Sequence, residues 1–492
     1  MTDLLPVRFT TAPSPKCSSF QQIGRPGLKA SQCRSFCPCW VQSVRKHKNI
    51  FFVDLSDGLS SHRLQAVIPA DKLDPQGIPL SVGCSLRING DLVPSPGKNQ
   101  KLELVTKQFS VLGKCDLSDY PFRPRNKYNV DFERGLQHLR PRLEKYAAVH
   151  RVRNKLIHAM HSYFQDLEFC QVQTPILTTN DCEGAGETFL VHHVDDLKQV
   201  PASQVTPQSI PDNTENENRG LRMQPTYFPS QCHLTVSSQL HLEALMHSIS
   251  RVYTIQTAFR AENASSRKHL CEFAMLEAEL VIESVDGLID LIEGLINRAW
   301  QEVCQMGEFK TVGEEWRDTV DAVLKNRFIR MTYDDALEEL KVLLILSVLD
   351  KKFQHPLKWG EDFKVEHENA LLDIYAERPI VVTHFPSIIK PFYMLERDGT
   401  YGPVAECFDL LLPIGGEAVG GSMRETDRTK LLEVIEKAGL KGLEWYVQLR
   451  EFGTIPHGGF GLGVDRLLQY FTNTHNIKDA VPFPRWQRHC QA

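Results

Sequence analysis

Long apolar runs, paired cysteines and an excess of basic charge are all missing from this chain of 492 residues. No stretch reaches the roughly 18 apolar residues that a membrane-spanning helix needs, so we predict none. The 13 cysteines lack the paired Cys-x-x-Cys spacing of a structural zinc site, so we expect no metal bound by cysteine. Because the formal net charge is -5, any contact with nucleic acid must rely on a local basic patch.

Residues 1–35 are poor in acidic residues and lack a continuous apolar segment. They contain one acid, Asp3, and are rich in Ser, Thr and Pro. Their basic residues are Arg8, Lys16, Arg25, Lys29 and Arg34. The missing apolar segment excludes a secretory signal, and the basic composition predicts an organellar transit peptide. A disordered leader is the alternative.

Residues 36–113 carry short runs of alternating apolar and polar residues at regular spacing. We expect strands at 40–44, 50–55, 64–68, 85–92 and 102–112. Short strands of this kind, separated by turn signals, predict an OB-fold β-barrel. Arg45 lies in a basic run close to Phe51 and Phe52, a combination that suits phosphate neutralisation and base stacking on single-stranded RNA.

Residues 114–145 are polar and contain several prolines, so we predict a linker. Residues 146–492 then form one large domain, interrupted by a polar insertion at 201–224. Near its start, apolar residues recur every three or four positions between 147 and 167, which predicts an amphipathic helix. A strand that ends at Thr174-Pro175-Ile176 follows this helix.

The stretch from Phe259 to Glu279 indicates two strands joined by a polar loop, because residues alternate on both sides of it. Such a hairpin places four side chains on one sheet face: Arg260, Glu262, His269 and Phe273. An Arg fork suits phosphate oxygens, a Phe ring stacks on a purine, and a Glu accepts from an exocyclic amine. The pattern predicts a nucleotide clamp, and a surface hairpin with scattered charges is the alternative.

This hairpin resembles motif 2 of the class II aminoacyl-tRNA synthetases. The helix and strand over 147–176 resemble motif 1, which forms the dimer interface in that family. The glycine-rich run 453–466, which ends in Asp465-Arg466, resembles motif 3, whose glycines leave room for adenine and whose Arg grips the γ-phosphate. Two further strings, LTVSSQLHLE at 234–243 and VTHFPSIIKPFYM at 382–394, resemble the asparaginyl branch of the aspartyl, asparaginyl and lysyl subgroup.

The resemblance implies which residues bind ATP and Mg²⁺. Arg260 and Arg466 would be catalytic, because they would neutralise phosphate charge. The full set implied in ATP binding is Arg260, Glu262, His269, Leu270, Phe273, Glu417, Gly463 and Arg466. Asp409 and Glu417 would share Mg²⁺ bridging the phosphates, since Mg²⁺ takes hard oxygen ligands and few protein contacts.

The resemblance also implies an amino-acid pocket. Glu183 would bind the α-ammonium of the substrate, Gln239 would hydrogen-bond it, and Arg424 would hold its side-chain oxygen. Glu243 lies four residues after Gln239 on the same helical face and would accept from the side-chain NH₂ of asparagine. At about 4 Å and an effective dielectric of ~20, its repulsion of aspartate would amount to ~4 kcal/mol.

In the barrel, the resemblance assigns anticodon reading to Arg45, Phe52 and Gln65. The fold implied is α+β, with a class II antiparallel sheet, flanking helices and the N-terminal OB-fold barrel. The implied activity is ATP-dependent attachment of asparagine to tRNA(Asn) through asparaginyl-adenylate, by a homodimer formed through 147–176, with no membrane partner. We expect the mitochondrial matrix, with the cytoplasm as the alternative. The alternative functions are an aspartyl-tRNA synthetase, discriminating or not, and a non-catalytic RNA-binding protein.

Overall fold

The computed structural model describes residues 38–72, 80–97, 100–123, 126–179, 187–193, 227–228, 230–263, 266–345 and 353–491. The predicted leader at 1–35 and the predicted insertion at 201–224 lie outside these residues. The chain divides into two compact units, one of residues 1–152 with 306–314 and one of residues 153–305 with 315–492. The domain boundaries expected from the sequence stay predictions.

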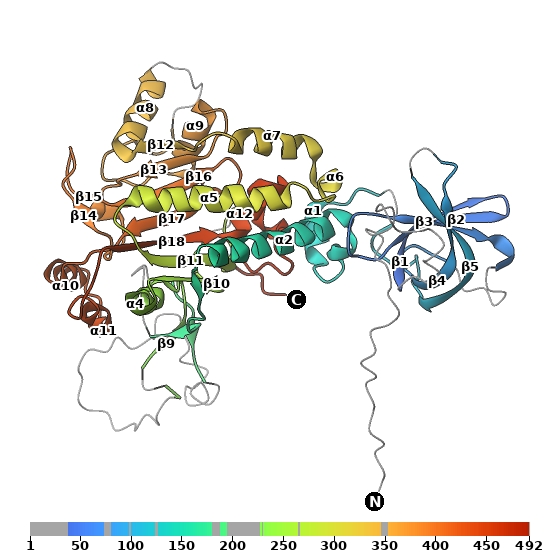
Figure 1. Cartoon of the computed structure of the whole chain (residues 1–492), viewed down its shortest axis with the longest axis horizontal. Helices are drawn as coiled ribbons and strands as arrows, with labels where there is room; N and C mark the ends of the chain where they lie inside the picture. Colours follow the sequence, from blue (N-terminus) through green and yellow to red (C-terminus); the bar gives the residue numbers. More distant parts are fainter. Residues whose placement is uncertain are drawn as a thin grey trace, which may run out of the picture. The chain divides into compact units, whose positions relative to one another are not determined.

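Five strands close into a β-barrel in the first unit, in the order β1-β2-β3-β5-β4 (Figure 1). They are β1 (Cys39–His47), β2 (Ile50–Ser56), β3 (Leu64–Pro69), β4 (Ser85–Pro94) and β5 (Leu102–Gly113). Val53, Leu55 and Ala66 are fully buried inside it, while Phe52, Asp54, Gln65 and Val67, which alternate with them, are only partly buried. Each strand is paired on both sides, and the predicted OB-fold barrel is confirmed.

The segment predicted as a linker contains helical structure of its own. α1 (Val130–Gly135) begins after Asn129, whose side chain accepts from the N–H of Asp131 and caps the helix. A 3-10 turn at Arg140–Arg142 follows, and α2 (Glu144–Asp166) then confirms the predicted amphipathic helix. The short helix α6 (Phe309–Val312) belongs to the first unit, as α1 does, although it is distant in the sequence.

Eight strands form the main sheet of the second unit, in the order β12-β13-β16-β17-β18-β11-β10-β6. They are β6 (Cys170–Gln171), β10 (Arg251–Phe259), β11 (Glu272–Val281), β12 (Ile329–Thr332), β13 (Ile380–Thr383), β16 (Cys407–Leu412), β17 (Gly416–Met423) and β18 (His457–Gly463). The run from β13 to β10 is antiparallel, whereas β12 and β6 pair in parallel at the two edges. The predicted class II antiparallel sheet is confirmed, and so is the α+β class.

Smaller elements surround this sheet. Short strands form two further sheets, β7 (Leu177–Thr178) with β9 (Cys232–Leu234) and β8 (Leu190–Val191), and β14 (Glu396–Arg397) with β15 (Val404–Ala405). The helices are α4 (Gln239–Ile249), α5 (Val285–Val303), α7 (Glu314–Leu324), α8 (Tyr333–Ile345), α9 (Val365–Ile374), α10 (Arg428–Lys437), α11 (Glu444–Gln448) and α12 (Val464–Thr472). Within the described residues, no helix has the length and apolar character to pass through a bilayer.

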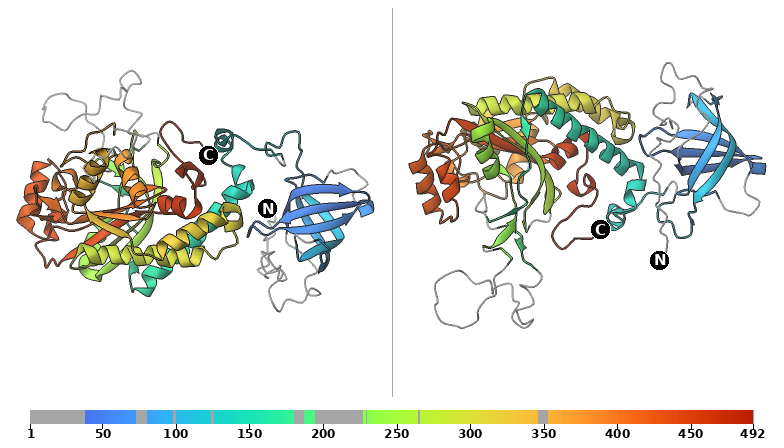
Figure 2. Two further views of the ribbon diagram at one scale, coloured as in Figure 1. Left: turned by 90° about the horizontal axis from the view of Figure 1, so that it is seen from above. Right: turned by 60° about the horizontal axis from the view of Figure 1, so that its bottom comes forward.

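Helices α2 and α5 pack against one face of the main sheet, whereas α4 packs against β10 and β11 and contributes residues to a pocket on the other face. α5 runs along β16, β17 and β18, as Figure 2 shows from two further directions. On β18, Phe460 stacks on Phe164 of α2, and a β-carbon at Gly458 would lie 3.0 Å from Leu288 of α5. Because successive residues of a strand face opposite sides, Gly459 and Gly461 face away from this helical layer.

Gly459 allows one side chain to lie across the sheet. It is directly opposite Glu279 of β11, and a β-carbon at Gly459 would lie 2.1 Å from Glu279 Oε1 and 2.3 Å from the backbone oxygen of Ala278. No side-chain atom fits at such distances, so this position requires glycine. Glu279 can therefore reach across β18 to Arg424, which follows β17.

Candidate active site

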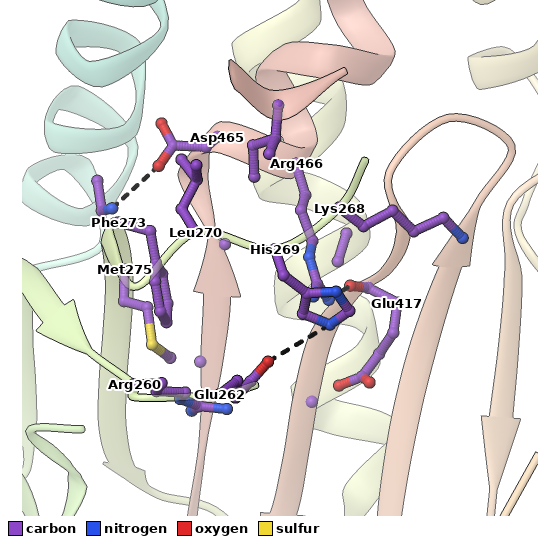
Figure 3. A pocket seen from close by; sticks show the side chains of 16 residues that line it. Arg260, Glu262, Lys268, His269, Leu270, Phe273, Met275, Glu417, Asp465 and Arg466 are labelled. Carbon is purple, nitrogen blue, oxygen red and sulfur yellow. Dashed lines mark hydrogen bonds and ion pairs between the residues drawn. The ribbon is translucent and has the colours of Figure 1, made fainter. Parts of the chain in front are cut away.

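All the residues predicted to bind ATP line one pocket on this second face of the sheet (Figure 3). The loop after β10 and the start of β11 contribute Arg260, Glu262, His269, Leu270 and Phe273. The region from β17 to α12 contributes Glu417, Gly463 and Arg466. Two segments that are far apart in the sequence thus line the same pocket.

Arg260 and Phe273 form the part of the wall nearest β10. The guanidinium carbon of Arg260 lies 5.6 Å from the centroid of the Phe273 ring. The backbone N–H of Arg260 donates to Cys271 O at 3.1 Å, which fixes the chain where the loop begins. An aromatic ring and a cation exposed to the same cavity suit a ligand with a base and a phosphate.

Arg466 lies in the first turn of α12. Its Nη1 donates to the backbone oxygen of Glu417 on β17. The preceding residue, Asp465, accepts from the N–H of Ala274 at 3.0 Å and pairs with Arg153 of α2. These contacts join the start of α12 to β11 and β17, and the helix N-terminus adds positive potential beside the guanidinium.

His269 and Lys268 add two more basic groups to the pocket. His269 Nε2 lies 3.6 Å from Glu262 Oε2. Burial, and to a lesser extent the nearby charge of Arg466, lowers the pKa of His269, so the ring is neutral near pH 7. Burial also lowers the pKa of Lys268, while Glu368, 3.8 Å from its Nζ, acts in the opposite direction. Lys268 was not assigned from the sequence, although the basic run at 267–269 is a signal for it.

A second pocket continues from the first. Five residues line both pockets, namely Arg260, Met275, Glu417, Gly420 and Gly461. Of the residues predicted to bind the amino acid, Gln239 and Arg424 line this second pocket. The predicted residue Glu183 lies outside the described residues.

Glu243 does not line the pocket, contrary to our prediction that it contacts the substrate. Its carboxylate is fully buried and accepts from Arg450 Nη2 at 2.8 Å and from the hydroxyl of Tyr446 at 2.7 Å. Leu242 lines the pocket instead. The spacing of four places Glu243 on the same face of α4 as Gln239, but one turn (about 5.4 Å) further along the helix. In this buried position, Glu243 supplies the negative charge that the buried guanidinium groups of Arg424 and Arg450 require.

Glu243 nevertheless determines how Gln239 is presented. Gln239 Nε2 donates to Glu243 Oε1 at 3.2 Å, which turns the amide oxygen of Gln239 away from Glu243. The pocket therefore receives a hydrogen-bond acceptor, which suits an ammonium group. Despite burial, Arg450 and His457 hold the pKa of Glu243 well below its usual range, so the carboxylate stays charged.

Arg424 is paired before any substrate arrives. Its Nε donates to Glu279 Oε1 at 3.1 Å, and its Nη1 donates to Ser422 Oγ at 2.6 Å. Burial raises the pKa of Glu279 to about 7, with Arg424 acting in the opposite direction. Glu277 lines the same pocket and accepts from the Ser238 N–H at 2.9 Å. Neither glutamate was assigned from the sequence, although their spacing of two on a strand indicates a shared face.

Asp409 and Glu417, the predicted Mg²⁺ ligands, approach one point beside the wall shared by the two pockets. A β-carbon at Gly420 would lie 3.3 Å from Glu417 Oε1 and 3.5 Å from Asp409 Oδ1. The other oxygen of Asp409, Oδ2, lies 2.5 Å from Lys390 Nζ. Burial raises the pKa of Asp409 to about 7, with Lys390 lowering it and Glu417 raising it further.

The donor set fits a hard cation that takes its remaining ligands from phosphate and water. Within the part of the chain that the structure describes, no group of three or more His, Cys, Asp or Glu side chains is arranged to hold a metal ion. A site of two carboxylates depends on the oxygens of a bound phosphate to complete the coordination.

The residues predicted to read the anticodon lie together on the barrel. Arg45 of β1 is opposite Phe52 of β2, and its Nη2 donates to Gln65 Oε1 of β3 at 3.0 Å. Phe51 packs against the barrel core, so Phe52, the next residue, lies on the opposite face. Their contact with RNA stays a prediction.

Comparisons with known proteins match the same two parts of the chain. The family described as tRNA synthetases class II (D, K and N) matches residues 129–487, and the family described as OB-fold nucleic acid binding domain matches residues 39–112. An asparagine–tRNA ligase of Nostoc sp. is 37% identical, over 91% of this chain and 94% of its own length. An asparaginyl-tRNA synthetase of Mus musculus is 35% identical, over 98% of this chain and 96% of its own length.

A solved structure extends the similarity to three dimensions. The crystal structure of asparaginyl-tRNA synthetase from Pyrococcus horikoshii, complexed with asparaginyl-adenylate, matches with a TM-score of 0.79 at 26% sequence identity. The match covers 97% of this chain and 100% of that chain. Sequence motifs, sheet topology, pocket and relatives agree, and this chain belongs to the class II aminoacyl-tRNA synthetases, in the asparaginyl-tRNA synthetase family.

Proposed function

We propose that this protein attaches asparagine to tRNA(Asn) in two steps. In the first, a carboxylate oxygen of asparagine forms a bond to the α-phosphorus of ATP, and the bond from that phosphorus to pyrophosphate breaks. In the second, the terminal ribose hydroxyl of the tRNA attacks the acyl carbon of the asparaginyl-adenylate, and AMP leaves. One observation carries the proposal: the pocket with Arg260 and Arg466 shares a wall with the pocket that contains Gln239 and Arg424.

Positioning and charge neutralisation account for the first step without a side-chain nucleophile. Arg260 lines both pockets, which suits a cation beside the phosphate under attack. Arg466 lines only the first pocket, where the outer phosphates of ATP would lie. We assign Mg²⁺ to Asp409 and Glu417, and when bound it would neutralise phosphate charge.

Charge balance around Arg424 supports asparagine as the substrate. Glu279 and Glu243 both lie within ion-pair distance of Arg424, and Glu243 also pairs with Arg450. Both guanidinium groups are thus already hydrogen-bonded to protein carboxyl groups, which leaves Arg424 less positive charge for a substrate carboxylate. A carboxamide, which both donates and accepts, suits such a site. Glu243 contributes to this selection through its charge rather than by contact.

Pyrophosphate exchange with asparagine and with aspartate, measured in parallel, tests the substrate. We expect kcat/KM for aspartate to be at least about 10-fold lower, because ~1.4 kcal/mol of unfavourable interaction with the protein carboxylates at this end of the pocket already corresponds to that factor. Comparable exchange with both amino acids would instead indicate a non-discriminating aspartyl enzyme. A folded protein with no exchange would indicate the non-catalytic RNA-binding alternative.

Arg260→Ala removes the cation that lines both pockets. We expect kcat for asparagine-dependent exchange to fall about 10²- to 10³-fold, as for the loss of one preorganised charge donor. Arg251→Ala is the matched control, because Arg251 is the exposed first residue of β10, the strand that Arg260 directly follows. Near-normal exchange by the Arg260 variant would contradict the role that we give to this residue.

We infer that two copies of the chain associate through 147–176. β6 is an edge strand of the main sheet, and both of its residues are exposed. Nearby in the sequence, Ile176 and Leu177 are 43% and 42% exposed. An edge strand with exposed apolar neighbours is a surface that a second copy can cover.

Sedimentation velocity at micromolar concentration should give the mass of two chains. The double substitution Ile176→Asp with Leu177→Asp should shift the protein to a single chain, because it introduces like charges at a symmetric interface. Val342→Asp, at a residue 50% exposed on α8, should leave the mass unchanged. A wild-type protein that sediments as one chain would contradict the inference.

We propose that the protein acts in mitochondrial translation, in the matrix. The support is the composition of residues 1–35, basic and nearly free of acids. Fused to a fluorescent reporter in eukaryotic cells, residues 1–35 should direct it to mitochondria. Replacement of the five basic residues of this segment by Gln should leave the reporter in the cytoplasm. A wild-type fusion that stays cytoplasmic would favour the cytoplasmic alternative.

A further inference from the structure

Lys390 is a charged residue of the amino-acid pocket that the two steps above do not use. It follows a 3-10 turn at Ser387–Ile389, between β13 and β14, and lines the pocket together with Asp409. Its side chain is only 13% exposed. An ammonium group removed from water to this extent needs a close counter-charge, so its partner is informative.

Two contacts fix the ammonium of Lys390. Its Nζ lies 2.5 Å from Asp409 Oδ2 and 3.9 Å from the centroid of the Phe385 ring. The second oxygen of the same carboxylate, Oδ1, lies on the side of Gly420, where Glu417 Oε1 also approaches. The two oxygens of Asp409 therefore have different surroundings, one beside the lysine and one beside the second carboxylate.

This arrangement has two physical consequences. A carboxylate is planar and rigid, so a strong contact at Oδ2 fixes the direction in which Oδ1 points. Asp409 and Glu417 also repel each other where they approach one point, and the charge of Lys390 offsets this repulsion. Without the lysine, Asp409 would gain the freedom to rotate away from Glu417.

We propose that Lys390 is a positioning residue for the binding of Mg²⁺ with ATP, because it holds Asp409 with Oδ1 directed toward Glu417 before ATP arrives. Lys390 acts through Asp409 and contacts neither asparagine nor ATP in this role. The inference rests on the proposed function, since it names a residue that prepares the ATP site for the first step.

The test compares Lys390→Met, which removes the charge, with Lys390→Arg, which keeps it. One readout is the Mg²⁺ concentration that gives half-maximal asparagine-dependent pyrophosphate exchange. The other, which needs no turnover, is calorimetric binding of ATP in MgCl₂ and in EDTA. For Lys390→Met we expect the half-maximal Mg²⁺ concentration, and the Kd of ATP in MgCl₂, to rise about 10- to 100-fold. The KM for asparagine and the Kd of ATP in EDTA should not change, and Lys390→Arg should restore wild-type values.

Two controls separate positioning from stability. Lys341→Met removes a Lys–Glu pair of 2.8 Å on the surface of α8 and should behave as wild type. The double variant Lys390→Met with Asp409→Asn leaves neither charge unpaired, so it should fold even if Lys390→Met alone does not. If Lys390 acts through Asp409, the double variant should match Asp409→Asn alone in both readouts.

Several results would overturn the proposal. These are wild-type Mg²⁺ dependence in Lys390→Met, a rise confined to the KM for asparagine, no restoration by Arg, or additive effects of the Lys390 and Asp409 substitutions. Failure of the proposed function would look different. In that case the wild-type protein would show no asparagine-dependent exchange, while ATP calorimetry would still report on Lys390.

Discussion

Alternation of side chains on two neighbouring strands, β11 and β18, governs the site. On β11, Phe273, Met275, Glu277 and Glu279 face the ligand side, and the residues between them pack toward the helices. On β18, every residue that faces the ligand side between 459 and 463 is a glycine, which leaves room for side chains of β11 such as Glu279 to lie across the sheet. The aromatic and acidic side chains of β11 and the glycines of β18 thus lie in neighbouring rows on the ligand side of the sheet. Residues of the loops complete the walls of the pockets.

Buried charge is the second constraint, and it is balanced locally. In the lining of the amino-acid pocket Arg424 is paired with Glu279, and outside this lining Arg450 is paired with Glu243. Beside the shared wall, Lys390 is paired with Asp409. A buried pair of this kind contributes little net stability, but loss of one partner is costly, which keeps the arrangement specific. The polar groups of the pocket are therefore held in place by ion pairs, of which the one between Glu243 and Arg450 lies outside the pocket lining.

Motifs that are contiguous in the sequence were predicted well. The barrel strands, the helix at 147–167 and the hairpin that carries Arg260 and Phe273 follow from periodicity, which is a local property, whereas the meeting of this hairpin with Arg466 was implied by the family resemblance. Glu243 was placed on the correct helix face but at the wrong depth, because its partner Arg450 is 207 residues away and spacing does not reveal it. Glu277, Glu279 and Lys390 were missed for the same reason, since their importance lies in contacts across strands. The linker prediction overlooked α1, although the cap at Asn129 is a local signal.

The wall common to the two pockets has a consequence for small molecules. Arg260, Met275, Glu417, Gly420 and Gly461 line both cavities, so a single rigid compound can occupy both at once. Such a compound loses translational freedom once rather than twice, and its affinity exceeds what its separate halves would give. Medicinal chemistry on this protein would gain most from linked inhibitors, with selectivity drawn from the half that meets Arg424.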